Sequence, residues 1–326
     1  MYNQTEAILS QYEIEIREIT KGRGSFICDT NKGKKILVPF RGSKEKGKLL
    51  SRFLAELQKR DFEVEQVEWT KNGEAVSEDE YTGERFILKS HMDGTEIDTG
   101  KMEDMVASVQ RLAQYHNVVE KIDIIIDQPR EAEMAIETWM RHYKELIKAR
   151  NYMRSRKKKN EFEQIYLKYY EHNRKSAEES LQLLEEINEG QQMVRCVFCH
   201  GDYNQHNVLW HNGTCQMVHF ENFVYNWYVI DLANFVRKML EKNEWNRTVG
   251  ITLVQEYDKI RPIRKEEFKL LYGLLLFPEK FWKITNHYMN SRKTWISGRD
   301  IDKLKRVIEQ EEKRLEFIEN IVAFLE

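Results

Sequence analysis

Residues 198–221 read FCHGDYNQHNVLWHNGTCQMVHFE, and within them His200, Asp202 and Asn207 form the spacing H-x-D-x-x-x-x-N. An apolar run precedes this stretch, and after an Asn-Gly turn a second strand-like run covers residues 217–220. Phosphotransferases hold a base and one metal ligand on such a loop, which lies between two short strands and carries an acid followed by an amide. The stretch therefore predicts a phosphotransferase-type loop.

One residue of the second strand-like run decides how a metal would be held. In kinases this strand delivers an aspartate to Mg²⁺, but here the position is occupied by His219. Imidazole is a poor ligand for Mg²⁺, which prefers oxygen donors. Glu221 lies on the same predicted strand face and offers a carboxylate, displaced by about 6 Å along the strand. The candidate metal ligands are therefore Asn207, Glu221 and His219.

Composition restricts the class of protein. The 326 residues suffice for two domains with separate cores, and 41% hydrophobic with 33% charged residues is typical of a globular protein. No stretch approaches the roughly 18 consecutive apolar residues of a membrane-spanning helix. Residues 1–22 lack a secretory signal, so we expect cytosolic synthesis and no membrane partner. A net charge of -2 predicts no general attraction to nucleic acid.

Cys196, Cys199 and His200 together match C-x-x-C-H, the attachment string of c-type haem. The chain shows no export signal and no second C-x-x-C that would complete a zinc site. Because the string lies within an apolar run, we interpret both cysteines as small hydrophobic residues on a buried strand.

Residues 1–93 predict a small antiparallel sheet with one helix. A hairpin signal surrounds Asn31-Lys32-Gly33, leucines at helical spacing fill residues 49–62, and two further strand patterns cover residues 64–69 and 84–94. From residue 94 to residue 326 the patterns are mainly helical.

Residues 131–190 form a charged helical insert with one glycine, Gly190, at the position of a helix stop. Within it, residues 148–159 hold seven basic side chains. They indicate either an anion-binding patch or a solvated helix face balanced by the acidic residues of 178–189, and the second interpretation is favoured.

Four segments carry a resemblance to a known family: HGDYNQHNVL, the Asp231-Leu element, LLLFPEKFWKITNHYMNSRKTW and RSRKKKNEFEQIYLKYY. Together they resemble the aminoglycoside phosphotransferase and choline kinase class, and more closely the CotS-type spore coat proteins. The resemblance implies an α+β, two-lobed protein kinase-like fold. Its small antiparallel-sheet N-lobe would span residues 1–93, and its large helical C-lobe would span residues 94–326 with a catalytic-loop remnant at 198–221.

The resemblance also implies roles for individual residues. Asp202 corresponds to the base that orients or deprotonates an acceptor hydroxyl, and His200 to the residue that holds the loop by hydrogen bonds. Asn207 corresponds to a ligand of the metal that accompanies the nucleotide. Asp231 corresponds to an aspartate that ties the catalytic loop to the next helix, although a helix N-cap explains it equally well.

Two departures from active kinases concern phosphate binding. Val38 stands where the strand of residues 34–38 should present the lysine that grips the phosphates, whereas Lys34 and Lys35 are offset. A shift of one residue along a strand turns the side chain to the opposite sheet face. The glycine-rich loop is reduced to Gly22-Arg23-Gly24, which is also typical of a plain hairpin turn.

These departures favour a catalytically degenerate kinase fold, a pseudokinase, that acts by binding or as a component of the spore coat. Its expected partners are other coat proteins or a coat saccharide. The alternative is an ATP- and Mg²⁺-dependent phosphotransferase that uses Asp202 as base towards a hydroxyl of a small molecule or saccharide. A third hypothesis, nucleic-acid binding through residues 148–159, is the weakest of the three.

Overall fold

The computed structural model describes residues 2–122, 131–189, 194–291 and 298–322. The chain divides into two compact units. Unit 1 contains residues 1–98, 114–127 and 200–223, and unit 2 contains residues 99–113, 128–199 and 224–326. The stretch predicted to hold the catalytic loop therefore lies almost entirely in unit 1, together with the N-terminal sheet.

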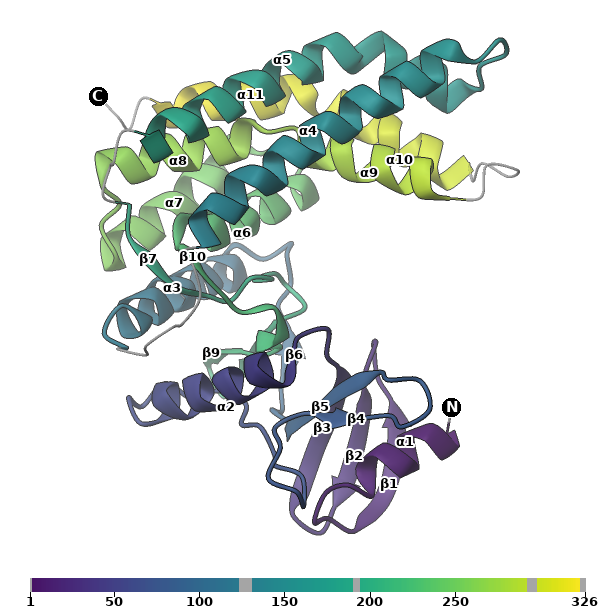
Figure 1. Ribbon diagram of the computed structural model, residues 1–326. Coiled ribbons are helices and arrows are strands. Elements are labelled where there is room, and N and C mark those ends of the chain that lie inside the picture. Colours follow the sequence, from purple (N-terminus) through teal and green to yellow (C-terminus); the bar gives the residue numbers. More distant parts are fainter. Residues whose placement is uncertain (1, 123–130, 190–193, 292–297, 323–326) are drawn as a thin grey trace. The chain divides into compact units, whose positions relative to one another are not determined.

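The sheet of unit 1 is antiparallel, as the sequence predicts (Figure 1). Its strand order is β1 (Ile16–Lys21), β2 (Phe26–Thr30), β3 (Gly33–Pro39), β5 (Arg85–Ser90) and β4 (Ser77–Glu78). The hairpin predicted around residues 31–33 is confirmed, because β2 and β3 pair across this turn.

The two faces of this sheet pack against different parts of unit 1. Leu37 of β3 and Leu88 of β5 belong to a buried cluster with Ile8 and Leu9 of α1 (Tyr2–Leu9). Side chains alternate along a strand, so Ile36 and Val38 belong to the opposite face. The predicted helix is α2 (Lys44–Gln58), whose first turn is capped by the Ser43 hydroxyl accepting from the Lys46 N–H at 3.1 Å.

The loop region of unit 1 forms a second, three-stranded sheet of β6 (Thr95–Glu96), β8 (Val208–His211) and β9 (Thr214–Met217). The predicted Asn-Gly turn is confirmed between β8 and β9. The strand predicted for residues 217–220 is wrong: β9 ends at Met217, because His219 adopts a left-handed conformation with φ 68°. Glu221 therefore lies in the short 3₁₀ helix η1 (Phe220–Asn222), and no strand displacement separates it from His219.

The strand predicted for residues 64–69 is also wrong as a continuous element. This segment makes only isolated bridges, including a parallel one between Val64 and Met217 and an antiparallel one between Val67 and Lys89. It thereby contacts both sheets of unit 1.

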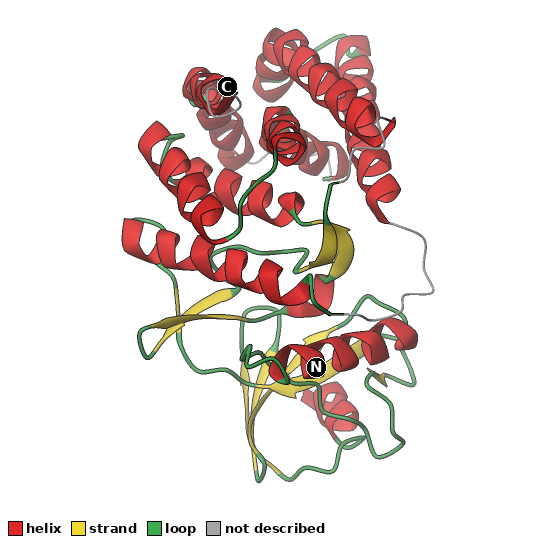
Figure 2. Cartoon of the chain, turned by 90° about the vertical axis from the view of Figure 1, so that its left-hand side faces the viewer, coloured by secondary structure: helices red, strands yellow, loops and turns green. Residues whose placement is uncertain are grey.

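Unit 2 is mainly helical (Figure 2). Its helices are α4 (Glu131–Ser155), α5 (Glu161–Glu189), α6 (Val229–Lys242), α7 (Arg247–Ile260), α8 (Lys265–Leu276), α9 (Glu279–Asn290), α10 (Gly298–Glu309) and α11 (Glu311–Val322). The α3 helix (Met102–Val119) has residues in both units, and β7 (Cys196–Cys199) pairs with β10 (Val224–Trp227) in unit 2.

The aromatic stripe of α9 is core, as expected: Phe281 and Tyr288 pack against Phe162 and Tyr166 of α5. The closing helix predicted from the sequence is two helices, α10 and α11, that meet at Gln310. The predicted helix stop, Gly190, lies outside the described residues.

Two arginines of the basic segment 148–159 form ion pairs with carboxylates that precede residues 178–189 in the sequence. Arg150 lies 3.9 Å from Glu171, and Arg156 lies 3.1 Å from Glu163. Asp231 lies in the first turn of α6 and is buried, so the N-cap interpretation is wrong: Tyr228 holds that position. Across the described ranges, no helix has the length and apolar character needed to cross a membrane.

Candidate functional site

A cleft of about 770 Å³ lies within unit 1. Its walls come from the β1–β2 turn, from the sheet face that carries Ile36 and Val38, from residues 90–96 and from the loop that holds Asp202 and Asn207. The cleft thus brings together the predicted base, the predicted metal ligands and the strand predicted to lack its lysine.

His200 holds the loop in place. It is fully buried, its Nε2 lies 2.9 Å from the Val218 carbonyl oxygen, and the Asp202 N–H donates to its Nδ1 at 3.3 Å. One ring therefore links the start of the loop to the residue that follows β9.

Asp202 and Asn207 lie against each other. The Asn207 amide nitrogen donates to the Asp202 carbonyl oxygen at 2.8 Å and to the carboxylate Oδ2 at 3.3 Å, and Asn204 donates to Oδ1 at 3.0 Å. Both bonds of Asn207 use its nitrogen, which leaves its oxygen as the atom that a metal would need.

Gly201, between His200 and Asp202, is required by the backbone. Its φ is +80°, and a Cβ built there would lie 1.9 Å from the carbonyl oxygen of Asn222. The loop and η1 therefore approach each other so closely that no side chain fits.

The reduced glycine loop also belongs to the cleft wall. Arg23 Nη1 lies 2.8 Å from Nδ1 of His206, and that nitrogen lies 2.6 Å from Oε2 of Glu96. The β1–β2 turn is thus connected to the loop through largely exposed polar side chains.

The lysines of β3 do not line the cleft. Val38 lies on the cleft face, is 5% exposed and pairs with Ile87 of β5. Lys35 shares the opposite face with Leu37 and forms an ion pair with Glu68. Lys34 is exposed.

The cleft face of the sheet does carry a lysine, but on β5. Lys89 pairs with Ile36 in the strand register and so shares the face of Ile36 and Val38. Its side chain is fully buried, and its ammonium donates to Glu65 Oε1 at 2.6 Å and to Glu221 Oε1. The sequence reasoning missed both Lys89 and Glu65.

Glu65 joins this lysine to the turn at His219. Its Oε1 accepts the backbone N–H of His219 at 2.9 Å and of Phe220 at 3.0 Å, in addition to the ammonium. The His219 ring then lies 3.6 Å from Glu221 through Nδ1. A buried ionic network therefore determines the conformation of residues 219–221.

The charges in this network stabilise one another. Burial by itself would lower the pKa of the Lys89 ammonium, but the carboxylates of Glu221 and Glu65 outweigh it and raise that pKa. Burial would likewise raise the pKa of Glu221, but Lys89 and then His219 hold it well below the ordinary range of a carboxyl group. Both groups of the Lys89–Glu221 pair are thus kept charged.

The predicted metal ligands do not fit Mg²⁺ as they stand. The one carboxylate among them, Glu221, is committed to Lys89, and the other two are an amide and an imidazole. Among the described residues no group of three or more His, Cys, Asp and Glu side chains is arranged to hold a metal.

One signal in the sequence could have revealed Lys89. The alternation in RFILKS places this lysine on the face of Ile87, and a lysine on a buried face requires an anionic partner. The partners themselves gave no signal, because Glu65 and Glu221 are separated from Lys89 by 24 and 132 residues.

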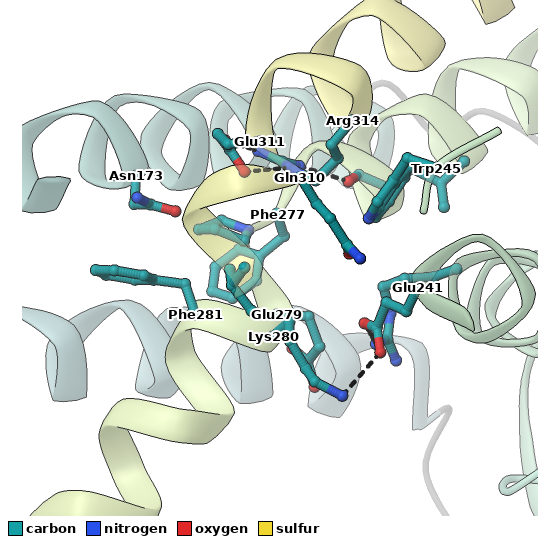
Figure 3. A pocket seen from close by; sticks show the side chains of 14 residues that line it. Asn173, Glu241, Trp245, Phe277, Glu279, Lys280, Phe281, Gln310, Glu311 and Arg314 are labelled. Atoms are coloured by element: carbon teal, nitrogen blue, oxygen red, sulfur yellow. Dashed lines mark hydrogen bonds and ion pairs between the residues drawn. The ribbon is translucent and has the colours of Figure 1, made fainter. Parts of the chain in front are cut away.

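A second cavity lies in unit 2 and is much smaller, about 20 Å³ (Figure 3). Such a volume holds about one water molecule. Its charged side chains pair with each other, Lys280 with Glu241 at 3.0 Å and Arg314 with Glu311 at 2.7 Å. We therefore take the cleft of unit 1 as the candidate site.

Comparison with known proteins identifies the family. Residues 5–321 match the sequence profile of the family described as "Spore coat putative kinase YutH". Spore coat protein S of Bacillus subtilis (strain 168) is 20% identical over 329 residues, which cover 96% of this chain and 92% of that protein.

Solved structures of phosphotransferases share the fold. An aminoglycoside phosphotransferase from Alicyclobacillus acidocaldarius subsp. acidocaldarius DSM 446 superposes with a TM-score of 0.80 at 18% identity, covering 98% of this chain and 96% of that chain. An amicoumacin kinase in complex with AMP-PNP and Ca²⁺ gives 0.63 at 12% identity, covering 96% and 92%. At these identities the likeness shows a kinase-like fold.

Proposed function

Because the chain belongs to the YutH family of spore coat kinase-like proteins, we propose that it is a component of the spore coat that binds a ligand in its kinase-type cleft without transferring phosphate. The coat location is supported by the relative named spore coat protein S. Other coat proteins or a coat saccharide are the partners that this location favours.

The observation that carries the proposal is the commitment of Glu221 to Lys89. Phosphoryl transfer depends on cations that neutralise the charge developing on the phosphates. Here His219 replaces the expected aspartate, and the nearby carboxylate is neutralised from inside the protein. Asp202 can then still act as a base towards a hydroxyl, but there is no activated phosphate for that hydroxyl to attack.

The direct test is a phosphotransfer assay with purified protein, radiolabelled ATP, Mg²⁺ or Mn²⁺, and coat saccharides as acceptors. We expect transfer by the wild type to equal that of the Asp202→Ala variant. Transfer that requires Asp202 would refute the proposal.

A second candidate function is a phosphotransferase acting on a hydroxyl of a small molecule or saccharide, with ATP and Mg²⁺. Two observations favour it. Hydrogen bonds hold the loop of His200, Asp202 and Asn207 in place, and Lys89 with Glu65 provides a lysine–glutamate pair on the cleft face of the sheet. Active kinases use such a pair, although they take the lysine from the neighbouring strand.

Thermal-shift titration separates the two candidates. A ligand that binds the native state raises the melting temperature as its concentration exceeds Kd. The phosphotransferase predicts stabilisation by ATP that requires Mg²⁺ and is weakened by Asn207→Ala. Stabilisation that is independent of metal, or an unchanged Asn207→Ala variant, would exclude this second candidate.

A further inference from the structure

The Lys89 ammonium occupies an unusual position for a lysine. Its side chain is fully buried and meets two carboxylates, those of Glu65 and Glu221. Lysine is rarely buried completely, and when it is, paired carboxylates compensate the lost hydration. A cation that bridges two carboxylates is what a divalent metal ion supplies in sites of this chemistry.

The place of this ammonium coincides with the place where a metal would be needed. Glu221 Oε1 contacts Lys89 on one side and lies 3.6 Å from the His219 ring on the other. The carboxylate of Glu221 therefore lies between the Lys89 ammonium and His219, the residue that stands where active kinases have the metal-binding aspartate. A metal ion bound at Oε1 of Glu221 would have to displace the ammonium.

The network also fixes the backbone around His219, as a bound metal ion could. Glu65, held by Lys89, accepts the backbone N–H groups of His219 and Phe220. His219 sits there with φ 68°, a conformation that is uncommon outside glycine and needs such support. The turn is thus fixed by a charge that belongs to the chain.

Two other cations in the cleft are available to a ligand. Arg41 and Lys46 line the cleft, and neither forms an ion pair with a carboxylate in the described part of the chain. The Lys46 ammonium lies 5.5 Å from the ring centre of Phe223, two residues beyond Glu221. Phosphate groups are the anions that such arginine and lysine side chains bind.

We propose that Lys89 is a tethered cation that replaces the divalent metal, so that the cleft receives a phosphate-bearing ligand without Mg²⁺. The inference rests on the proposed binding function of the cleft. It adds the chemical class of the ligand and the reason that no metal accompanies it.

The first test measures metal binding alone, with Mn²⁺ as probe and electron paramagnetic resonance as readout. The variants are Lys89→Met, His219→Asp and the double variant. The wild type and His219→Asp should bind no Mn²⁺ at this site, because Lys89 still neutralises Glu221. The double variant should gain a Mn²⁺ site, with a Kd at least about tenfold below the highest Mn²⁺ concentration at which His219→Asp shows no binding.

A matched control is available on the same sheet. Lys35 is also a nearly buried strand lysine paired with a glutamate of the 64–69 segment, but on the opposite face. Lys35→Met combined with His219→Asp should therefore gain nothing. Circular dichroism of every variant checks folding, and the wild type and His219→Asp decide the question even if Lys89→Met does not fold.

The second test measures ligand binding by calorimetry, with ATP and with tripolyphosphate, in EDTA and in Mg²⁺. We expect the same Kd in both buffers, within about twofold, and weaker binding by at least about fivefold in Lys46→Met. Binding that requires Mg²⁺, or no binding in either buffer, would overturn the proposal.

The results separate this inference from the proposed function. Mn²⁺ binding by the wild type that Glu221→Gln abolishes would overturn the tethered cation, whatever the phosphotransfer assay gives. Asp202-dependent phosphotransfer by a protein that binds no Mn²⁺ at Glu221 would refute the proposed function and leave the tethered cation standing.

Discussion

At the scale of single residues, the site depends on a lysine that no water reaches. Moving a charged group into a protein interior costs several kcal/mol, and only close partners offset the cost. Lys89 has its partners in Glu65 and Glu221, which come from separate segments of unit 1. The same contacts that keep Lys89 charged also occupy Oε1 of Glu221.

Glu221→Gln should make the stability of the protein less dependent on pH. The pKa of Glu221 is depressed in the folded state, so its ionised form contributes stability above the unfolded pKa of about 4.3, and this contribution is lost as the pH falls through the folded value. We expect the variant to lose about 2 kcal/mol near neutral pH and progressively less in acid. Urea denaturation across this range measures the difference, and a constant difference would contradict the assignment.

Gly201 permits a comparison with a glycine of the same conformation. Gly201 and Gly213 both have φ +80°, but only at Gly201 would a Cβ meet a backbone atom, the Asn222 oxygen at 1.9 Å. Gly213→Ala should cost about 1 kcal/mol, the ordinary strain of a left-handed residue. Gly201→Ala should cost about 3 kcal/mol or more, because loop and η1 must separate. Equal denaturation midpoints for the two variants would contradict the close approach of Gly201 to Asn222.

At the scale of elements, α5 begins with a reciprocal cap. The Glu163 N–H donates to Asn160 Oδ1 at 3.0 Å, and the Asn160 N–H donates back to Glu163 Oε2 at 3.0 Å. Asn160 also donates to the Tyr288 hydroxyl of α9 at 2.9 Å. The cap thus links two helices of unit 2.

Asn160→Ala should therefore cost more than the loss of an ordinary cap. Asn246 caps α7 by accepting hydrogen bonds from the backbone of Thr248 and Val249. We expect the free energy of unfolding to fall by about 2 kcal/mol in Asn160→Ala and by about 1 kcal/mol in Asn246→Ala. Urea denaturation of the two variants tests the difference. If Asn246→Ala proved equally or more damaging, the contribution of the α5–α9 link would be disproved.

The basic segment at the end of α4 should not bind nucleic acid. Arg150 and Arg156 are paired with Glu171 and Glu163, which reduces the charge available to phosphates. A gel-shift assay at low salt, where phosphate contacts are strongest, should show no retention of DNA or RNA. Retention that salt abolishes would restore the nucleic-acid hypothesis.

Which elements the sequence could predict depended on whether their cause was local. The β2–β3 hairpin, α2 and the α4–α5 pair carry their signals in turn residues and helical spacing. Residues 64–69 have a strand-like pattern, but their bridges go to distant segments, so no local signal could show that the strand fails. The H-x-D-x-x-x-x-N loop was readable because its residues are close in the sequence, whereas the carboxylate partners of Lys89 lie 24 and 132 residues away from it.

At the scale of the whole molecule, unit 1 is assembled from three separate parts of the chain: residues 1–98, 114–127 and 200–223. The later parts supply core contacts to the first. Phe53 of α2 stacks on Phe223 at 5.6 Å between ring centres, and Phe62 packs on Tyr115 at 5.7 Å. A domain boundary near residue 93, as the sequence predicts, would cut these contacts.

A fragment of residues 1–98 should therefore fail to unfold cooperatively. The fragment keeps the sheet but loses the ion pair of Lys89 with Glu221 and the aromatic rings that pack on α2. A small sheet whose buried face is uncovered has only marginal stability. A fusion of residues 1–98 to residues 200–223 through a Gly/Ser linker should recover cooperativity, because β6 pairs with β8 and brings the two ends together. Thermal melts followed by circular dichroism compare the fragment, the fusion and the full chain. Cooperative melting of the fragment alone would show that the N-terminal sheet is an independent domain and that the Lys89 network is dispensable for it.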